Sequence, residues 1–175
     1  GPTATPTPTP PPGPTPTPAG TFTSTTWYLF NTNVSGVTPA GQIMQTTKSG
    51  VTGWQPTKTV TTTAAYWYGS AQSGTYNAGT YTFYLWTNNP GSASNVTVTL
   101  YKVNADGSGA VQLGTQTLNA GQSAGGNHAT TYTFSGVSAV TLSNQRLMVK
   151  IVKAAGVDCV MCYNTNDFPT RLITP

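Results

Sequence analysis

The chain has 175 residues, of which only 6% are charged, and its seven basic and three acidic residues give a net charge of +4. The basic residues form no dense cluster, which argues against nucleic-acid binding, and no apolar run is long enough to span a membrane. A polar surface built from Thr, Ser, Asn, Gln and Gly predicts an extracellular or cell-surface protein. No secretion leader is visible, which predicts that the chain is a mature form.

Residues 1–18 contain only Pro, Thr, Gly and Ala and hold nine of the fourteen prolines. Proline fixes φ and lacks an amide donor, so this segment cannot form a helix or a central strand. We expect residues 1–20 to form an extended tail whose proline-rich run is a polyproline II rod of roughly 55 Å. The composition is that of O-glycosylated stalks, and the candidate acceptors are Thr3, Thr5, Thr7, Thr9, Thr15 and Thr17.

Residues 21–175 are enough for one domain with a full core. Their β-branched and aromatic runs, separated by turn sequences, predict strands throughout. The expected strands are Thr21–Phe30, Gln42–Thr46, Thr57–Thr63, Ala65–Tyr68, Thr80–Thr87, Val96–Val103, Val111–Leu118, Thr130–Phe134, Val140–Leu142, Arg146–Lys153, Asp158–Tyr163 and Arg171–Thr174. Strands at this spacing predict an all-β fold, an antiparallel sandwich of two sheets with a jelly-roll-like order.

Three of the expected strands show a clear alternation of side chains between two faces. The faces separate Tyr81, Phe83 and Leu85 from Thr82, Tyr84 and Trp86; Val96, Val98, Leu100 and Lys102 from Thr97, Thr99, Tyr101 and Val103; and Leu147, Val149 and Ile151 from Met148, Lys150 and Val152. Such alternation is typical of strands with one face against a core.

Four sequence motifs follow one another within residues 65–175: GTYTFYLW, VTVTLYKVNADG, LSNQRLMVKI and PTRLITP. In this order they resemble a group of secreted bacterial and archaeal β-sandwich domains, and more distantly the jelly-roll modules of the galactose-binding type. The motifs are strands and turns, so the resemblance implies the fold and transfers no functional residue.

The residue types needed for catalysis are scarce. The three carboxylates are Asp106, which lies in a hairpin turn, and Asp158 and Asp167, which flank a strand, so the paired carboxylates of a glycosidase are not expected. The single histidine, His128, lies in a Gly-rich loop, and no G-x-S-x-G elbow is present. We predict that the protein is not an enzyme and holds no cofactor.

Cys159 and Cys162 are the two cysteines of the chain. Secretion would permit a disulfide between them, but residues i and i+3 of a strand point to opposite faces, so this candidate bond needs a local turn. Two buried reduced thiols and bonds to other chains stay open as alternatives. A zinc site with His128 and Asp158 is also open, although a single C-x-x-C is a weak signal, and a strand context disfavours a redox motif.

Candidate surface sites come from two sequons and two aromatic clusters. The sequons begin at Asn33 and Asn95 and predict N-glycosylation. The clusters TTWYLF and AAYWYGS supply candidate assembly or ligand aromatics, which are Trp27, Tyr28, Phe30, Tyr66, Trp67 and Tyr68. Neighbouring residues on a strand point to both faces, so part of each cluster fills the core. The exposed rings would stack on sugars or line a groove for a polyproline II segment.

Three functions fit these features. The first expectation is a structural subunit of an extracellular filament, in which the tail or a donor strand from Thr21–Phe30 docks on neighbouring copies of the same chain. The alternative is a carbohydrate-binding module attached through a Pro/Thr linker, and a surface-layer or adhesin fragment is a third reading. Copies of itself are the expected partners of the filament subunit, and glycans are those of the module.

Overall fold

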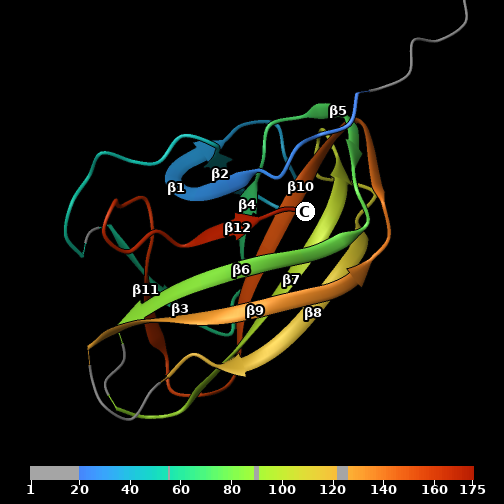
Figure 1. The fold of residues 1–175 in the computed structure, drawn as a ribbon. Coiled ribbons are helices and arrows are strands. Elements are labelled where there is room, and N and C mark those ends of the chain that lie inside the picture. The colour runs from blue at the N-terminus through green and yellow to red at the C-terminus, as the bar shows by residue number, and fades with distance from the viewer. Residues whose placement is uncertain (1–19, 55, 89–90, 122–125) are drawn as a thin grey trace, which may run out of the picture.

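The computed structural model describes residues 20–54, 56–88, 91–121 and 126–175, and these ranges form strands and no helix (Figure 1). The all-β class predicted from the sequence is confirmed. The expected tail rod and its threonines lie outside the described residues. The strands are β1 (Thr26–Val34), β2 (Gly41–Gln45), β3 (Thr57–Val60), β4 (Ala65–Tyr68), β5 (Gln72–Tyr76), β6 (Gly79–Asn88), β7 (Ser94–Asn104), β8 (Val111–Asn119), β9 (Asn127–Val137), β10 (Val140–Gly156), β11 (Cys159–Cys162) and β12 (Arg171–Ile173).

The strands join in one hydrogen-bonded path, β3-β11-β6-β12-β1-β2-β4-β10-β7-β8, with β5 attached to β10 and β9 to β6. All these pairings are antiparallel except that of β2 with β4, which is parallel. The expectation was two separate sheets. Instead, β1 and β2 link the two halves of the sandwich, because β1 pairs with β12 on one side and with β2 on the other.

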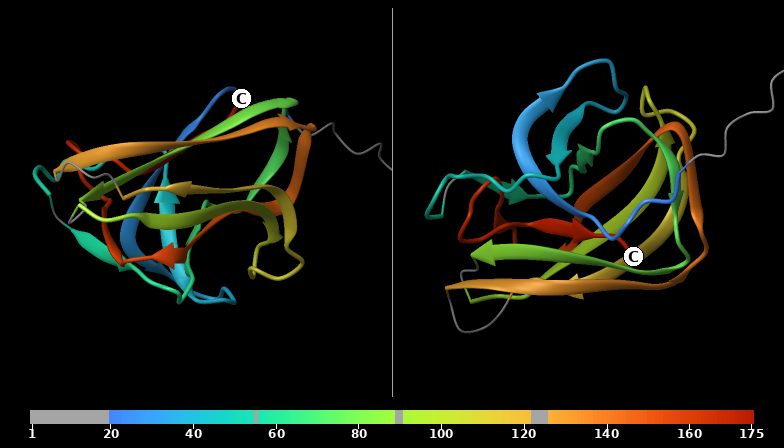
Figure 2. Two further views of the ribbon diagram at one scale, coloured as in Figure 1. Left: turned by 90° about the horizontal axis from the view of Figure 1, so that it is seen from below. Right: turned by 45° about the horizontal axis from the view of Figure 1, so that its top comes forward.

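The sheet folds over on itself into two layers. In Figure 1, β6 and β9 cross in front of β7 and β8, and the turned views of Figure 2 place these two pairs in separate layers. β12 adds to the layer of β6, and β10 adds to the layer of β7. Each layer therefore has an inner face toward the other layer and an outer face toward solvent.

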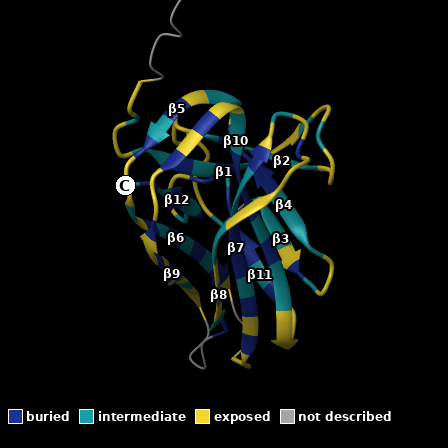
Figure 3. Cartoon of the chain, turned by 90° about the vertical axis from the view of Figure 1, so that its right-hand side faces the viewer, coloured by how far each residue is buried: buried dark blue, intermediate teal, exposed yellow. Residues whose placement is uncertain are grey.

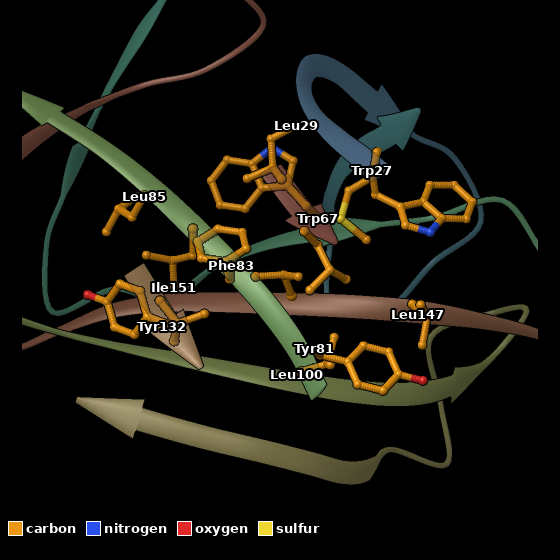
Figure 4. Close-up of a cluster of buried hydrophobic side chains, with 14 of the residues drawn as sticks. Trp27, Leu29, Trp67, Tyr81, Phe83, Leu85, Leu100, Tyr132, Leu147 and Ile151 are labelled. Atoms are coloured by element: carbon orange, nitrogen blue, oxygen red, sulfur yellow. The ribbon is translucent and has the colours of Figure 1, made fainter. Parts of the chain in front are cut away.

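The inner faces carry the predicted alternation. Every second residue of β6 from Tyr81 to Thr87 is buried, and so are Val96, Val98 and Leu100 of β7 and Leu147, Val149 and Ile151 of β10. Thr99, Val103 and Met148 are also buried, because part of the outer face is covered as well. Figure 3 shows how burial varies along the strands. Figure 4 shows the resulting core, in which the Phe83 and Tyr132 rings meet edge to face at a centroid distance of 6.2 Å. Burying a large apolar side chain stabilises a fold by about 1.5–3 kcal/mol, so this core dominates stability.

A smaller apolar cluster lies on the outer face of the β4–β10–β7 layer. Tyr68, Val103 and Met148 are buried in it, and Val34 and Tyr66 are among the half-buried residues that pack against it. The Tyr68 hydroxyl donates a hydrogen bond to the Pro39 carbonyl at 2.6 Å, which ties the turn between β1 and β2 to this cluster.

Most strand boundaries differ from the sequence prediction by one to four residues, and β1, β5 and β10 show the causes of the larger differences. β1 begins at Thr26, because the preceding residues leave its ladder: the Phe22 amide donates to the Thr75 carbonyl on β5, at 2.9 Å. β5 was not predicted, since its polar sequence QSGTY gives no apolar alternation. β10 runs unbroken through residues 143–145, where a bulge with Asn144 at a φ of 51° looks like a turn in the sequence.

Candidate ligand-binding face

The outer face of β6 carries aromatic rings. The core side of this strand holds Tyr81, Phe83 and Leu85, all fully buried, so its alternation turns Tyr84 and Trp86 outward, where both are half-buried. The sequence alternation had separated these two residues from the core set without giving them a function.

Neighbouring strands add polar groups beside these rings. Tyr84 stands opposite Thr131 on β9 and opposite Arg171 on β12, and residues directly opposite one another share a face. The guanidinium carbon of Arg171 lies 4.3 Å from the centroid of the Tyr84 ring. Thr131 is exposed, so a hydroxyl is available to solvent next to the ring.

Two further rings come from loops. Phe168 meets Trp86 at a centroid distance of 5.3 Å and Trp54 at 5.0 Å, both edge to face. Trp54 and Phe168 are half-buried. The four residues Trp54, Phe168, Trp86 and Tyr84 are called the outer aromatic row below.

Hydrogen bonds hold the loops of the outer aromatic row in place. The Gly53 amide donates to Oδ2 of Asp167 at 2.6 Å, and the Thr165 hydroxyl donates to the Gly53 carbonyl at 2.8 Å. The Trp86 amide donates to Oγ1 of Thr170 at 3.1 Å, and that hydroxyl donates to the Cys162 carbonyl at 2.6 Å. Backbone and side-chain bonds thus position Trp54 and Phe168 before any ligand arrives.

Half of the aromatic residues singled out from the sequence are structural. Trp27, Trp67 and Tyr68 are 2%, 0% and 0% exposed, so their rings have no face for a ligand or a neighbouring subunit. Nε1 of Trp67 donates to the Phe30 carbonyl at 3.1 Å, which locks the indole into the core. This part of the prediction was wrong. Neighbouring residues of an aromatic cluster on a strand point to opposite faces, and here Trp27, Trp67 and Tyr68 point to the buried side.

The remaining three, Tyr28, Phe30 and Tyr66, are half-buried. They do not join the outer aromatic row, whose loop members Trp54 and Phe168 stand singly in the sequence. Only the alternation of residues 80–86 could have indicated any member of the row in advance.

The cysteines are not bonded to each other. Cys159 and Cys162 are buried thiols on β11, and the candidate disulfide between them is wrong because the segment is an extended strand without the turn that such a bond requires. Burial raises the pKa of the Cys162 thiol to about 11 and also raises the pKa of Cys159. Both thiols are therefore poorly reactive near neutral pH.

The carboxylates and the histidine have local structural partners. Asp106 accepts bonds from the Ser108 amide and hydroxyl, which lowers its pKa, and Asp158 pairs with Lys153 at 2.5 Å. His128 lies in β9, where Nε2 is 2.8 Å from the Ala120 carbonyl. The described ranges bring together no group of three or more His, Cys, Asp or Glu side chains, so the zinc alternative with His128 and Asp158 is not assembled.

Asn33 and Asn95, the first residues of the two sequons, are exposed on β1 and β7. Their glycosylation stays a prediction. In the ranges that the structure describes, no helix is long and apolar enough to cross a membrane.

No family model and no curated protein matches the sequence. Among solved structures, a CocE/NonD family hydrolase from Staphylococcus aureus matches 87% of this chain with 36% of its own length, at 10% identity and a TM-score of 0.61. An aminopeptidase from a marine sediment Thaumarchaeota archaeon matches 88% of this chain with 37% of its own, at 8% identity and a TM-score of 0.61.

An α-amino acid ester hydrolase matches 87% of this chain with 36% of its own length, at 8% identity and a TM-score of 0.61. This chain therefore spans about a third of the length of the hydrolases that it resembles. At identities of 8–10% the likeness shows the fold alone: this β-sandwich is similar to one part of larger hydrolases.

Proposed function

We propose that the protein is a non-catalytic carbohydrate-binding module of a secreted protein, and that it holds neutral polysaccharide against the outer aromatic row. The observation that carries this proposal is the gathering of Trp54, Phe168, Trp86 and Tyr84 around one outer face. The sequence alone favours the filament over this function.

The chemistry of the face suits a sugar chain. A pyranose ring presents C–H groups on its flat sides and hydroxyls at its edge, so it needs an apolar platform flanked by hydrogen-bonding groups. The Trp54, Phe168 and Trp86 rings supply the platform, since the Arg171 guanidinium already lies over the Tyr84 ring. Thr131 and Arg171 supply a hydroxyl and a guanidinium beside Tyr84.

The charged groups of the face are Arg171, whose guanidinium lies over the Tyr84 ring, and Asp167. The only carboxylate beside the row is that of Asp167, and its Oδ2 accepts the Gly53 amide, which gives it a structural role. Stacking of a sugar on the half-buried rings involves no charged group, so this part of the interaction would persist at high salt.

The likeness to one part of larger hydrolases supports an accessory role, because a β-sandwich of this kind can be one domain of a longer chain. The Pro/Thr composition of residues 1–18 is that of a spacer between such domains. An accessory module holds a substrate close to a neighbouring domain and catalyses no reaction itself.

The test is binding to insoluble cellulose, chitin and xylan by co-sedimentation. We expect the wild type to bind at least one of them and Trp86→Ala or Trp54→Ala to lose about twofold to tenfold in affinity, since stacking on one ring is worth about 0.5–1.5 kcal/mol. Tyr101→Ala is the matched control, because Tyr101 is also half-buried but lies on β7 in the other layer. Absence of wild-type binding, or unchanged binding by both variants, contradicts the proposal.

A filament subunit is the second candidate, and the N-terminal segment favours it. Gly20–Phe22 runs parallel to β5, with the Phe22 amide bonded to Thr75 O and the Thr75 amide bonded to Gly20 O, each at 2.9 Å. The centroids of the Phe22 and Tyr76 rings lie 4.5 Å apart. If a neighbouring copy supplied this segment, the exchange would link subunits.

The segment, rather than β1, would be the exchanged element. Trp27 and Leu29 of β1 are in the core, so removing that strand would open the sandwich. Electron microscopy of the purified chain would test the filament, with Phe22→Ala as the variant expected to shorten or abolish it. Single particles of the wild type at all concentrations would rule this candidate out.

A further inference from the structure

A polar hollow of about 490 Å³ lies away from the outer aromatic row and shares no residue with it. Its walls come from the β1–β2 hairpin, β3, and residues 61–66. The polar and aromatic residues that line it are Asn33, Gln42, Lys58, Thr59, Thr61, Thr63 and Tyr66. The hollow thus offers amides, hydroxyls, one ammonium group and one aromatic ring.

The hollow carries the positive charge of Lys58, and no acidic residue of the lining neutralises it. No carboxylate lines it, and Asp106 and Asp167 accept bonds from Ser108 and the Gly53 amide. Asp158 lies closer, since the amide of its partner Lys153 donates to the Thr61 carbonyl at 2.8 Å, but its charge is paired with Lys153. Among the described residues Lys58 therefore has no acidic partner. Lys150 stands opposite Tyr66 in the β4–β10 pairing and so lies on the same face as this ring, adding a second cation.

The walls are fixed in place. β2 and β4 pair in parallel at Gln42 and Trp67, and they approach so closely at Gly41 that a Cβ there would lie 2.6 Å from the Tyr66 carbonyl oxygen. The hydrogen bond from Tyr68 to Pro39 holds the hairpin from the other side. A preformed hollow loses little conformational entropy when a ligand enters.

We propose that this hollow binds an acidic saccharide, a hydroxyl-rich sugar unit that carries a carboxylate. The carboxylate pairs with Lys58, in the field of Lys150. The hydroxyls bond to Asn33, Gln42 and the threonines, and the Tyr66 ring covers the apolar side of the sugar. The volume is within the range of small-molecule sites, about 300–1,000 Å³, and accommodates one or two sugar units.

The proposal goes beyond the neutral-polysaccharide function and is separable from it. The two sites differ in charge, so they differ in the ligand and in the effect of salt. Binding at Lys58 weakens as ionic strength rises, because the charges are close to solvent, whereas stacking on the outer aromatic row does not.

Titration calorimetry with an oligogalacturonate, compared with the same oligosaccharide after reduction of its carboxyl groups, tests the proposal. We expect the acidic form to bind and the reduced form to bind at least threefold more weakly. Lys58→Gln should lose threefold to tenfold in affinity, and Lys150→Gln should lose less, because it acts at longer range. Lys48→Gln is the charge-matched control, since Lys48 is exposed and outside the lining.

Thermal melting of each variant distinguishes loss of binding from loss of folding, and Thr59→Val gives a second probe of the lining that keeps all charges. Equal affinity for the acidic and reduced forms, or equal losses in Lys58→Gln and Lys48→Gln, would overturn the proposal. Trp86→Ala should leave oligogalacturonate binding unchanged, and Lys58→Gln should leave co-sedimentation with neutral polysaccharide unchanged. Failure of one site is thereby distinguished from failure of the other.

Discussion

The guanidinium of Arg171 covers the ring of Tyr84 across the pairing of β12 with β6, with its central carbon 4.3 Å from the ring centroid. Nη1 of the same side chain donates to the Pro169 carbonyl at 3.2 Å. One cation therefore connects the C-terminal strand, the loop that carries Phe168, and the strand that carries the outward rings. This links the stability of the last strand to the shape of the outer aromatic row.

Replacement of Arg171 by methionine should lower the free energy of unfolding by about 0.5–1 kcal/mol, the usual strength of a half-exposed cation–π contact. Urea denaturation measures this change. Arg171→Lys should recover part of the loss, because an ammonium group keeps the charge but not the flat stacking. Equal stability of the methionine variant and the wild type would show that the contact is energetically neutral.

Trp67→Ala and Trp86→Ala should separate stability from binding. Trp67 is fully buried, so its truncation should cost about 3–5 kcal/mol in unfolding free energy. Trp86 is half-buried on the outer face, and its truncation should cost less than half of that while reducing polysaccharide binding. Urea denaturation and co-sedimentation on the same preparations would check this, and a greater stability loss at Trp86 than at Trp67 would contradict the assignment of core and surface.

Alkaline pH should unfold the protein. Burial away from water raises the pKa of Tyr68 from 10.0 to about 12, and burial also raises the pKa values of Tyr81 and Tyr132. Because the unfolded chain releases these protons first, the stabilisation is complete below pH 10 and is lost as the pH rises through 12. Ultraviolet absorbance of tyrosinate, followed with circular dichroism, should show that these phenols ionise together with unfolding.

Tyr68→Phe provides the control for this pH effect. It removes the hydrogen bond to Pro39, which should lower stability at neutral pH by about 1 kcal/mol. It also removes one ionisable phenol, so the loss of stability between pH 10 and 12 should be shallower than in the wild type. An identical pH dependence in both proteins would show that Tyr68 does not contribute.

The two cysteines should resist thiol reagents in the folded protein. Their burial and raised pKa values disfavour the thiolate, so alkylation at pH 8 should be slow in buffer and fast in guanidinium chloride. Mass spectrometry after alkylation would count the modified thiols. A single disulfide-linked species in the unreduced protein would show that the buried-thiol state is incorrect.

The sequence predicted the fold well where side chains alternate strictly. Residues 80–86 separate the core from the outer face as expected, because burial of every second residue is the physical basis of that pattern. On β7, Val96, Val98 and Leu100 are buried as expected, but Thr99 on the opposite face is buried too. β5 was missed since Gly74 leaves its strand without a side chain where Phe22 packs closely against it, and this contact comes from a distant segment. The link of the two layers through β1 and β2 was also missed, because the sequence of a strand does not specify which other strands it pairs with.

The candidate sites were harder to predict than the fold. The aromatic clusters of the sequence indicated Trp27 and Trp67 as candidate site residues, but both are buried in the core. A high local density of aromatic residues does not show which face of a strand each ring occupies. Trp54 and Phe168 are more than one hundred residues apart and meet only because Asp167 and Thr165 fasten their loops together. The hollow around Lys58 likewise depends on three separate segments of the chain. Neither site therefore has a sequence motif from which it could be predicted.

The pairing of β1 with β12 has a mechanical consequence. The Thr25 amide donates to Oγ1 of Thr174 and the Thr174 amide donates to the Thr25 carbonyl, both at 2.9 Å, so residues 25 and 174 lie side by side at one end of this ladder. Tension applied through residues 25 and 174 would load the β1–β12 ladder one hydrogen bond at a time, as in opening a zipper, rather than shearing all its bonds together. The domain would therefore yield at low force under such a pull, whereas a load on the outer face would be carried by the long strands β6 and β9.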